Sequence, residues 1–138
     1  MTASPSNAES PLGEVDRQAI VAVATEYILS WLDDDADRLV QCIHPDLAKR
    51  MVDSRGAPGR AAIVDLGANQ LVEGVAAGLG NAYDRTVEVD ILDAYPPIAS
   101  VMVRSVPFVE YLHLARFDER WLVLNVVWQR RPGFIQPR

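Results

Sequence analysis

The sequence predicts an α+β domain in which helices come first and an antiparallel sheet follows. Apolar residues recur at three- and four-residue spacing from Val15, as on one face of a helix, whereas the chain from Thr86 alternates between apolar and polar residues, as in half-buried strands. A length of 138 residues suits one domain with a substantial core. We therefore expect a disordered tail over residues 1–13, a single domain over 14–132, and a C-terminal tail over 133–138.

Three helices are expected in the first half of the chain. The first has one apolar stripe, formed by Ile20, Ala24, Tyr27, Ile28, Trp31 and Leu32. It ends at Asp33-Asp34-Asp35, where a carboxylate can cap a second, short helix over about Ala36–Ile43. After a short strand at Leu47–Val52 and turn residues at 54–59, a third helix is predicted over about Arg60–Leu79. Its apolar face is Val64, Ala68, Leu71, Val72, Val75 and Leu79.

The second half of the chain is expected to form a four-stranded meander, over Thr86–Asp93, Ile98–Ser105, Phe108–Phe117 and Trp121–Gln129. The final hairpin turns at Asp118-Glu119. A two-residue turn there places His113 opposite Leu124, whereas a three-residue turn that includes Arg120 places His113 opposite Asn125. Because a shift of one residue reverses the side chains that face the core, the sequence leaves both alternatives open.

Composition excludes several classes of function. The net charge of −6 disfavours nucleic-acid binding, which needs clustered Lys and Arg. The single cysteine, Cys42, excludes an internal disulfide and is typical of a cytoplasmic protein. Residues 1–13 lack the basic and apolar regions of a signal peptide, and no apolar run is long enough to cross a membrane. The two histidines, His44 and His113, lack metal-ligand spacing, so no metal is expected.

The segments Y-x-x-S-W-x-D-x-D (Tyr27–Asp35), I-H-P-D (Ile43–Asp46) and Y-L-H-L-A-R-F-D-E-R-W-L-V-L-N-V-V-W (Tyr111–Trp128) resemble the putative lumazine-binding family. That family belongs to the nuclear transport factor 2-like superfamily, whose members include ketosteroid isomerase, scytalone dehydratase and polyketide cyclases. The resemblance covers about Val15–Pro132. It implies a cone-shaped curved antiparallel sheet wrapped around the N-terminal helices, an apolar pocket at the open end, and a homodimer formed through the outer sheet surface.

The resemblance also implies two catalytic residues. Tyr27 is similar in position to the pocket tyrosine of ketosteroid isomerase, and His113 to its oxyanion-hole acid. The general base of that enzyme aligns near Met51, where this chain has no carboxylate. His113 also lies in a row of apolar and aromatic residues, which predicts that its imidazole is buried. Six further residues are candidates for substrate binding: Trp31, His44, Arg50, Tyr111, Asn125 and Trp128.

These features lead to two hypotheses about function. The first is a cofactor-independent isomerase, dehydratase or cyclase that binds a small hydrophobic or aromatic molecule and moves protons with His113 and Tyr27. The second is a non-catalytic ligand-binding or dimeric interaction module. A homodimer is expected in either case, because both faces of the final hairpin are apolar and one domain can bury only one of them.

Overall fold

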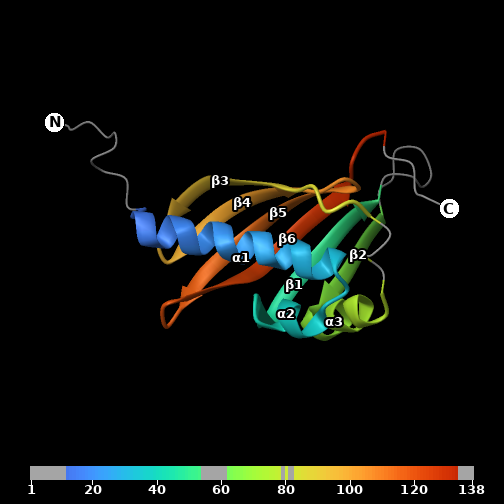
Figure 1. Cartoon of the computed structure of the whole chain (residues 1–138), viewed down its shortest axis with the longest axis horizontal. Coiled ribbons are helices and arrows are strands. Elements are labelled where there is room, and N and C mark those ends of the chain that lie inside the picture. The colour runs from blue at the N-terminus through green and yellow to red at the C-terminus, as the bar shows by residue number, and fades with distance from the viewer. Residues whose placement is uncertain (1–11, 54–61, 79, 81–82, 134–138) are drawn as a thin grey trace.

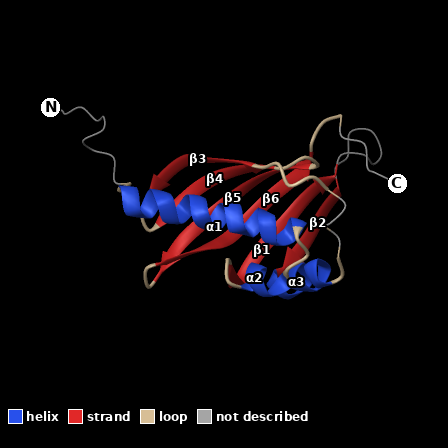
Figure 2. Ribbon diagram, in the orientation of Figure 1, coloured by secondary structure: helices blue, strands red, loops and turns tan. Residues whose placement is uncertain are grey.

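The computed structural model describes residues 12–53, 62–78, 80 and 83–133. Helix α1 (Glu14–Leu32) lies across one face of a curved sheet, as Figure 1 shows. Helices α2 (Ala36–Val40) and α3 (Ala68–Ala76) lie together at the end of the sheet that β1 and β2 form (Figure 2). The predicted α+β class is therefore confirmed, with the helices on the inner face of the sheet.

The sheet has six described strands: β1 (Ile43–Asp53), β2 (Ala62–Gly67), β3 (Glu88–Tyr95), β4 (Ile98–Arg104), β5 (Phe108–Phe117) and β6 (Arg120–Arg130). Their order is β2-β1-β6-β5-β4-β3. The predicted meander forms its β3–β6 part, and the only parallel pair among the described strands is β1 with β6. The sheet is curved and is not closed into a barrel.

The apolar stripe of α1 packs onto the inner face of the sheet. Ile20, Ala24, Tyr27, Ile28 and Leu32 are buried, as the helical spacing predicts. Inward-facing residues of the sheet complete the core: Val101, Val103, Leu112, Leu114, Val123 and Val126. Leu12 also packs against this core, so the ordered domain begins before the expected end of the tail. Residues 1–11 and 134–138, which make up most of the two predicted tails, lie outside the described residues.

The helix predicted over Arg60–Leu79 is wrong in its first part. Residues 62–67 form β2, which pairs antiparallel with β1, and the helix α3 begins only at Ala68. The segment Ala62–Gly67 has both a β-branched pair and spacing that suits a helix, and the neighbouring strand decides between them by supplying hydrogen-bond partners. Gly67 precedes the first turn of α3, and the Gln70 side chain accepts a hydrogen bond from its N–H. Residues 60, 61 and 79 lie outside the described part of the chain.

The structure also corrects the boundary between α2 and β1. Helix α2 ends at Val40 rather than Ile43, and β1 runs over Ile43–Asp53 rather than Leu47–Val52. The early start has a tertiary cause, because β1 pairs in parallel with β6 from Ile43 onward, with a register shift between Ile43 and Ala48. The N–H of Val123 donates to the carbonyl oxygen of Cys42 at 2.8 Å, just before β1 begins.

The final hairpin combines features of both predicted registers. Phe117 pairs with Arg120, so the turn has two residues, Asp118 and Glu119, both with positive φ (50° and 71°). A bulge in β6 between the partners of His113 and Leu114 then shifts the register by one residue. It places His113 opposite Asn125 while Leu112 and Leu114 stay in the core.

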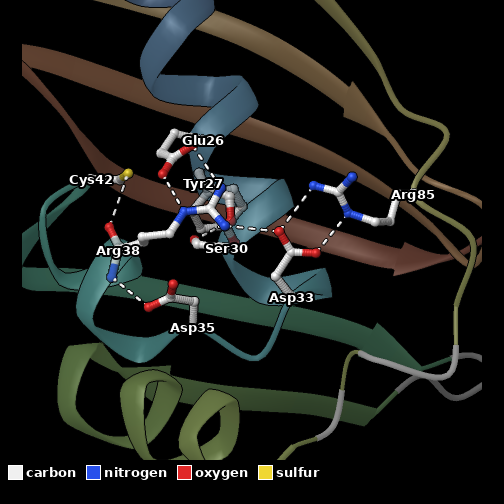
Figure 3. Close-up of polar contacts among 8 residues, drawn as sticks. All are labelled: Glu26, Tyr27, Ser30, Asp33, Asp35, Arg38, Cys42 and Arg85. Carbon is white, nitrogen blue, oxygen red and sulfur yellow. Dashed lines mark hydrogen bonds and ion pairs between the residues drawn. The ribbon is translucent and has the colours of Figure 1, made fainter.

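An ion-pair cluster holds α2 against the end of α1 (Figure 3). The Arg38 guanidinium donates to both Glu26 carboxylate oxygens and to Asp33 at 2.8 Å, and Arg85 also donates to Asp33. Asp35 caps α2 by accepting from the Arg38 N–H, as predicted for the aspartate run. Hydrogen bonds from Arg38 lower the pKa of Glu26, and those from Arg85 and then Arg38 lower the pKa of Asp33.

We expect Arg38→Gln to remove part of the acid dependence of stability. A carboxyl group whose pKa is lowered in the folded state stabilises the fold at pH values above its ordinary pKa, which is 4.5 for Glu26 and 3.8 for Asp33. This stabilisation is lost as the pH falls through the folded-state pKa. The variant should lose about 1 kcal/mol at pH 7 by urea unfolding, since these groups are only partly buried. On acidification, the free energy of unfolding of the variant should then fall by less than that of the wild type. Arg17→Gln, which removes an exposed pair with Glu14, is the control. Equal acid sensitivity in both variants would contradict the assignment.

Candidate functional site

The inner face of the sheet and the helices line a partly open cavity of about 640 Å³. It lies between the C-terminal end of α1, the inner sides of β1, β2, β5 and β6, and α3. The residues that line it are Trp31, Lys49, Leu66, Gln70, Leu71, Gly74, Tyr83, Phe108, Glu110, Trp128 and Arg130. This volume is in the range of cavities that bind small molecules in proteins.

A buried polar cluster of Tyr27, Lys49 and Glu110 lies at the wall of this cavity. The Tyr27 hydroxyl donates to Glu110 Oε1 at 3.0 Å and accepts from Lys49 Nζ at 2.7 Å. Lys49 Nζ also lies 3.4 Å from Glu110 Oε1, and the two side chains are only 6% and 3% exposed. The cluster is thus a buried ion pair joined by a phenol, and Lys49 and Glu110 both contact the cavity.

The surroundings of the cluster keep the phenol neutral. Burial, reinforced by the negative charge of Glu110 and the hydrogen bond to it, raises the pKa of Tyr27 well above its ordinary value. The ammonium of Lys49 lies over the ring of Tyr27 at 5.2 Å and the ring of Trp128 at 5.3 Å, within the range of cation–π attraction. Tyr27 therefore remains a hydrogen-bond donor at neutral pH.

Strand alternation explains how both charged residues come to face inward. On β5, Glu110 lies between the buried residues Phe108 and Leu112, and on β1, Lys49 follows the buried Leu47 by two positions. Neither residue is among those predicted from the sequence for the site. A signal was present, because Lys49 is the only lysine in the chain and Glu110 stands between Phe108 and Leu112 in an alternating row that is apolar up to Arg116.

Aromatic side chains form another wall of the cavity. Trp31 stacks on Tyr83 at 6.0 Å between ring centroids, and Phe108 makes edge contacts with Trp31 at 5.3 Å and with Trp128 at 4.7 Å. Within the described part of the chain, the buried Trp128 Nε1 has no hydrogen-bond partner. This wall offers flat apolar surfaces and a free indole N–H next to the buried polar cluster.

The predicted site residues divide between the two faces of the sheet. Tyr27, Trp31 and Trp128 lie on the inner side, where Trp31 and Trp128 line the cavity and Tyr27 bonds to two of its residues. His113, Tyr111 and Asn125 lie on the outer face with exposed side chains. Thus the expectation that the His113 imidazole is buried is wrong, because β5 alternation turns Glu110, Leu112 and Leu114 inward instead.

The two remaining candidates lie away from the interior cavity. His44 Nδ1 accepts from the Asp46 N–H at 2.9 Å, and its ring contacts that of Phe117 at 4.6 Å. Arg50 forms an exposed ion pair with Asp65 at 2.7 Å. Arg50 also lines a shallow outer pocket of about 350 Å³ with Tyr111, His113 and Asn125, so four of the predicted residues meet on the outside of the sheet.

The described residues contain no group of three or more His, Cys, Asp or Glu side chains arranged to hold a metal ion. None of the helices in the described part of the chain combines the length and apolarity needed to cross a membrane.

A long helix across a curved, unclosed sheet with an interior cavity defines an α+β cone of the nuclear transport factor 2-like class. The chain belongs to the family described as Putative lumazine-binding, whose model matches residues 15–129. Both conclusions confirm the resemblance found in the sequence.

Solved structures agree on the fold. An NTF-2-like protein of unknown function from Silicibacter pomeroyi is 12% identical, with a TM-score of 0.70, and the match covers 87% of this chain and 100% of that one. An NTF2-like protein from Shewanella baltica is 14% identical (TM-score 0.66, coverage 88% and 99%). A ketosteroid isomerase-like protein from Erwinia carotovora is 15% identical (TM-score 0.55, coverage 91% and 100%). No curated protein is significantly similar. Family and fold together suggest a small-molecule-binding protein.

Proposed function

We propose that the interior cavity binds a small, flat, ring-containing molecule and that Glu110, Tyr27 and Lys49 move a proton on it. The observation that carries this proposal is the buried cluster of these three residues at the wall of an aromatic-lined cavity of about 640 Å³. The reaction class is a cofactor-independent isomerisation, dehydration or cyclisation. Tyr27 keeps the catalytic role expected from the sequence. Glu110 supplies a carboxylate in place of the one that is absent near Met51.

The roles follow from the chemistry of each group. Glu110 is a carboxylate that faces the cavity and can act as the general base. Tyr27 and Lys49 are the donors next to it, and they can stabilise the negative charge that develops when a proton leaves a carbon next to a carbonyl group. A low-dielectric surrounding strengthens such hydrogen bonds, so three polar groups can suffice. The ketosteroid isomerase-like description of one structural neighbour is consistent with this class.

A binding assay and an exchange assay test the proposal. β-Naphthol should bind by calorimetry, and Trp31→Leu should weaken its binding, whereas Tyr111→Leu on the outer face should leave its binding unchanged. The α-protons of β-tetralone should exchange with solvent deuterium faster in the presence of the protein, as followed by NMR. Glu110→Gln should lower this rate at least about 100-fold, the lower range for general acid–base catalysis. Exchange in Glu110→Gln as fast as in the wild type would overturn the assigned base.

The second candidate function is a non-catalytic ligand-binding module. The specific observation in its favour is that Lys49, Tyr27 and Glu110 are already paired with one another, as in a purely structural cluster. Binding of β-naphthol in the cavity, together with no protein-dependent exchange of β-tetralone, would support this function over the first.

We also propose that the protein is a homodimer formed through the outer face of the sheet. Large apolar side chains are exposed there: Ile98 at 60%, Tyr111 at 47%, Val127 at 45% and Phe117 at 37%. Tyr111 and Val127 are directly paired across β5 and β6, so their exposed surfaces are contiguous. A second copy of the chain would bury this patch.

Sedimentation equilibrium at micromolar concentration should give the mass of a dimer. Val127→Lys should give a monomer, because it places a charge at the centre of the apolar patch. Val15→Lys, at an 83% exposed position on α1, should remain dimeric. A monomer mass for the wild type would refute the proposed dimer.

The proposal for the site requires no cofactor, since each of its groups belongs to the chain. We propose a cytoplasmic location on the basis of Cys42, which is buried and unpaired. The net charge of −6 supports a neutral or cationic small molecule rather than nucleic acid as the partner.

A further inference from the structure

We propose that Lys49 is a nucleophilic amine that captures the carbonyl group of an aromatic aldehyde or ketone and forms an imine with it. This inference rests on the proposed function, because it names the substrate class of the same cavity and gives Lys49 a covalent role in it. Nothing in the family description or in the structural neighbours assigns a role to this residue.

The position of Lys49 suits covalent capture. Its side chain is 6% exposed, yet the residue lines the cavity, so a molecule reaches the amine through the cavity rather than from bulk solvent. Tyr27 Oη and Glu110 Oε1 are its two polar neighbours. An ammonium group has three N–H bonds, and these two neighbours leave one direction for a bound molecule.

Glu110 resolves the difficulty that a protonated lysine is not a nucleophile. Its carboxylate oxygen lies 3.4 Å from Nζ, which is close enough for the proton to pass from the ammonium to the carboxylate when a ligand displaces water. The product is a neutral amine beside a neutral acid, and an apolar cavity accepts that pair more readily than separated charges. Arg50, the next residue in β1, is exposed and faces away, so this arrangement is specific to Lys49.

The aromatic wall defines the ligand class. Trp128 lies under the Lys49 ammonium at 5.3 Å and also contacts Phe108, so an aromatic ring held against these side chains carries its substituent toward Nζ. A carbonyl group attached to such a ring presents its carbon to the amine. The proton donors available to the oxygen of that carbonyl are the Tyr27 hydroxyl and Glu110, once Glu110 has taken the proton of Lys49.

The reaction balances without an added reagent. The Lys49 ammonium first gives a proton to Glu110, and the amine lone pair then forms a C–N bond while the C=O π pair moves to oxygen. One proton passes from nitrogen to that oxygen, giving a neutral carbinolamine. Glu110 then protonates the hydroxyl group, which leaves as water while the nitrogen lone pair forms the C=N bond. The iminium ion ends beside the Glu110 carboxylate. When the substrate is a ketone with a hydrogen on the adjacent carbon, this carboxylate can remove that proton, whereas an aromatic aldehyde stops at the imine.

The test is reductive trapping of the full chain with naphthaldehyde and cyanoborohydride, followed by peptide mass mapping. The chain has only two kinds of primary amine, Lys49 and the N-terminus, so the N-terminus is an internal reference. In solution the α-amino group is the less protonated amine, with a pKa of about 8 against about 10.4 for lysine, and should react first. We expect the reverse, with Lys49 labelled at least about tenfold faster, which corresponds to about 1.4 kcal/mol. Naphthalenemethanol, which lacks the carbonyl, should protect Lys49 and not the N-terminus.

Two further measurements separate a reactive lysine from an accessible one. Glu110→Gln should slow the trapping of Lys49 at neutral pH, because the carboxyl group that protonates the leaving hydroxyl of the carbinolamine has been removed. Labelling confined to the N-terminus, with naphthalenemethanol bound in the cavity, would overturn the role of Lys49 and leave the proposed function intact. Failure of naphthalenemethanol and β-naphthol to bind would overturn both.

Discussion

Lys49→Met should destabilise the protein by about 3–5 kcal/mol, because removal of one member of a buried ion pair leaves the other charge unpaired. Glu110 is 2% exposed, and its remaining polar neighbour in the cluster, Tyr27, supplies a single hydrogen bond. The hydrogen bond from Lys49 to Tyr27 is lost as well. Urea unfolding followed by circular dichroism measures the change.

Two variants make this result interpretable. Arg50→Met removes the neighbouring but exposed pair with Asp65 and should cost less than about 1 kcal/mol. The double variant Lys49→Met/Glu110→Leu should recover most of the loss, because a well-packed apolar pair often equals or exceeds a buried ion pair in stability. If Lys49→Met costs no more than Arg50→Met, the cluster is not a buried ion pair in solution, and the site proposed above fails with it.

Gly80→Ala should destabilise the protein by about 3 kcal/mol or more, at the upper end of overpacking substitutions. A Cβ at this position would overlap the carbonyl oxygen of Trp31 and lie 2.9 Å from Cα of Leu32. These are backbone atoms of α1, so a rotamer change cannot relieve the clash. The Gly80 N–H also donates to Asp34 Oδ1 at 2.7 Å, which holds the segment against the end of the helix.

The matched control is Gly67→Ala, where the nearest atom to a new Cβ is 3.9 Å away. This change should cost about 1 kcal/mol or less, as expected for a glycine at the N-terminal end of a helix. Because Trp31 lines the cavity, Gly80→Ala should also weaken β-naphthol binding in the fraction that remains folded. Equal melting temperatures for the two variants would show that the close approach to α1 is absent in solution.

Local patterns in the sequence were sufficient for most of the fold. The stripe of α1 and the alternation of β3 to β6 appear in the structure close to their predicted boundaries, since each depends on a period that neighbouring residues set. Over residues 62–76, by contrast, the local pattern did not decide the secondary structure. Its spacing suits a helix, but pairing with β1 made its first part a strand, and that partner is set by the tertiary fold.

The register of the final hairpin shows the same division. Asp118 and Glu119 form the two-residue turn, which a local pattern could predict. The bulge at Leu124, which places Asn125 opposite His113, depends on packing. With the bulge, Val123 and Val126 both remain in the core although they are three residues apart. Strict alternation cannot produce this spacing, so the sequence left the partner of His113 open.

The candidate site divides in a corresponding way. The sequence alone determined that Tyr27 and Trp31 lie on the apolar stripe of the first helix. It also placed Trp128 in the second strand of the final hairpin. Only the tertiary structure brought Lys49 of β1 to 2.7 Å from Tyr27 of α1 and joined both to Glu110 of β5. The physical reason is that a charged residue on a strand is ordinarily solvated. Its burial becomes favourable only when a partner of opposite charge, far away in the chain, folds against it.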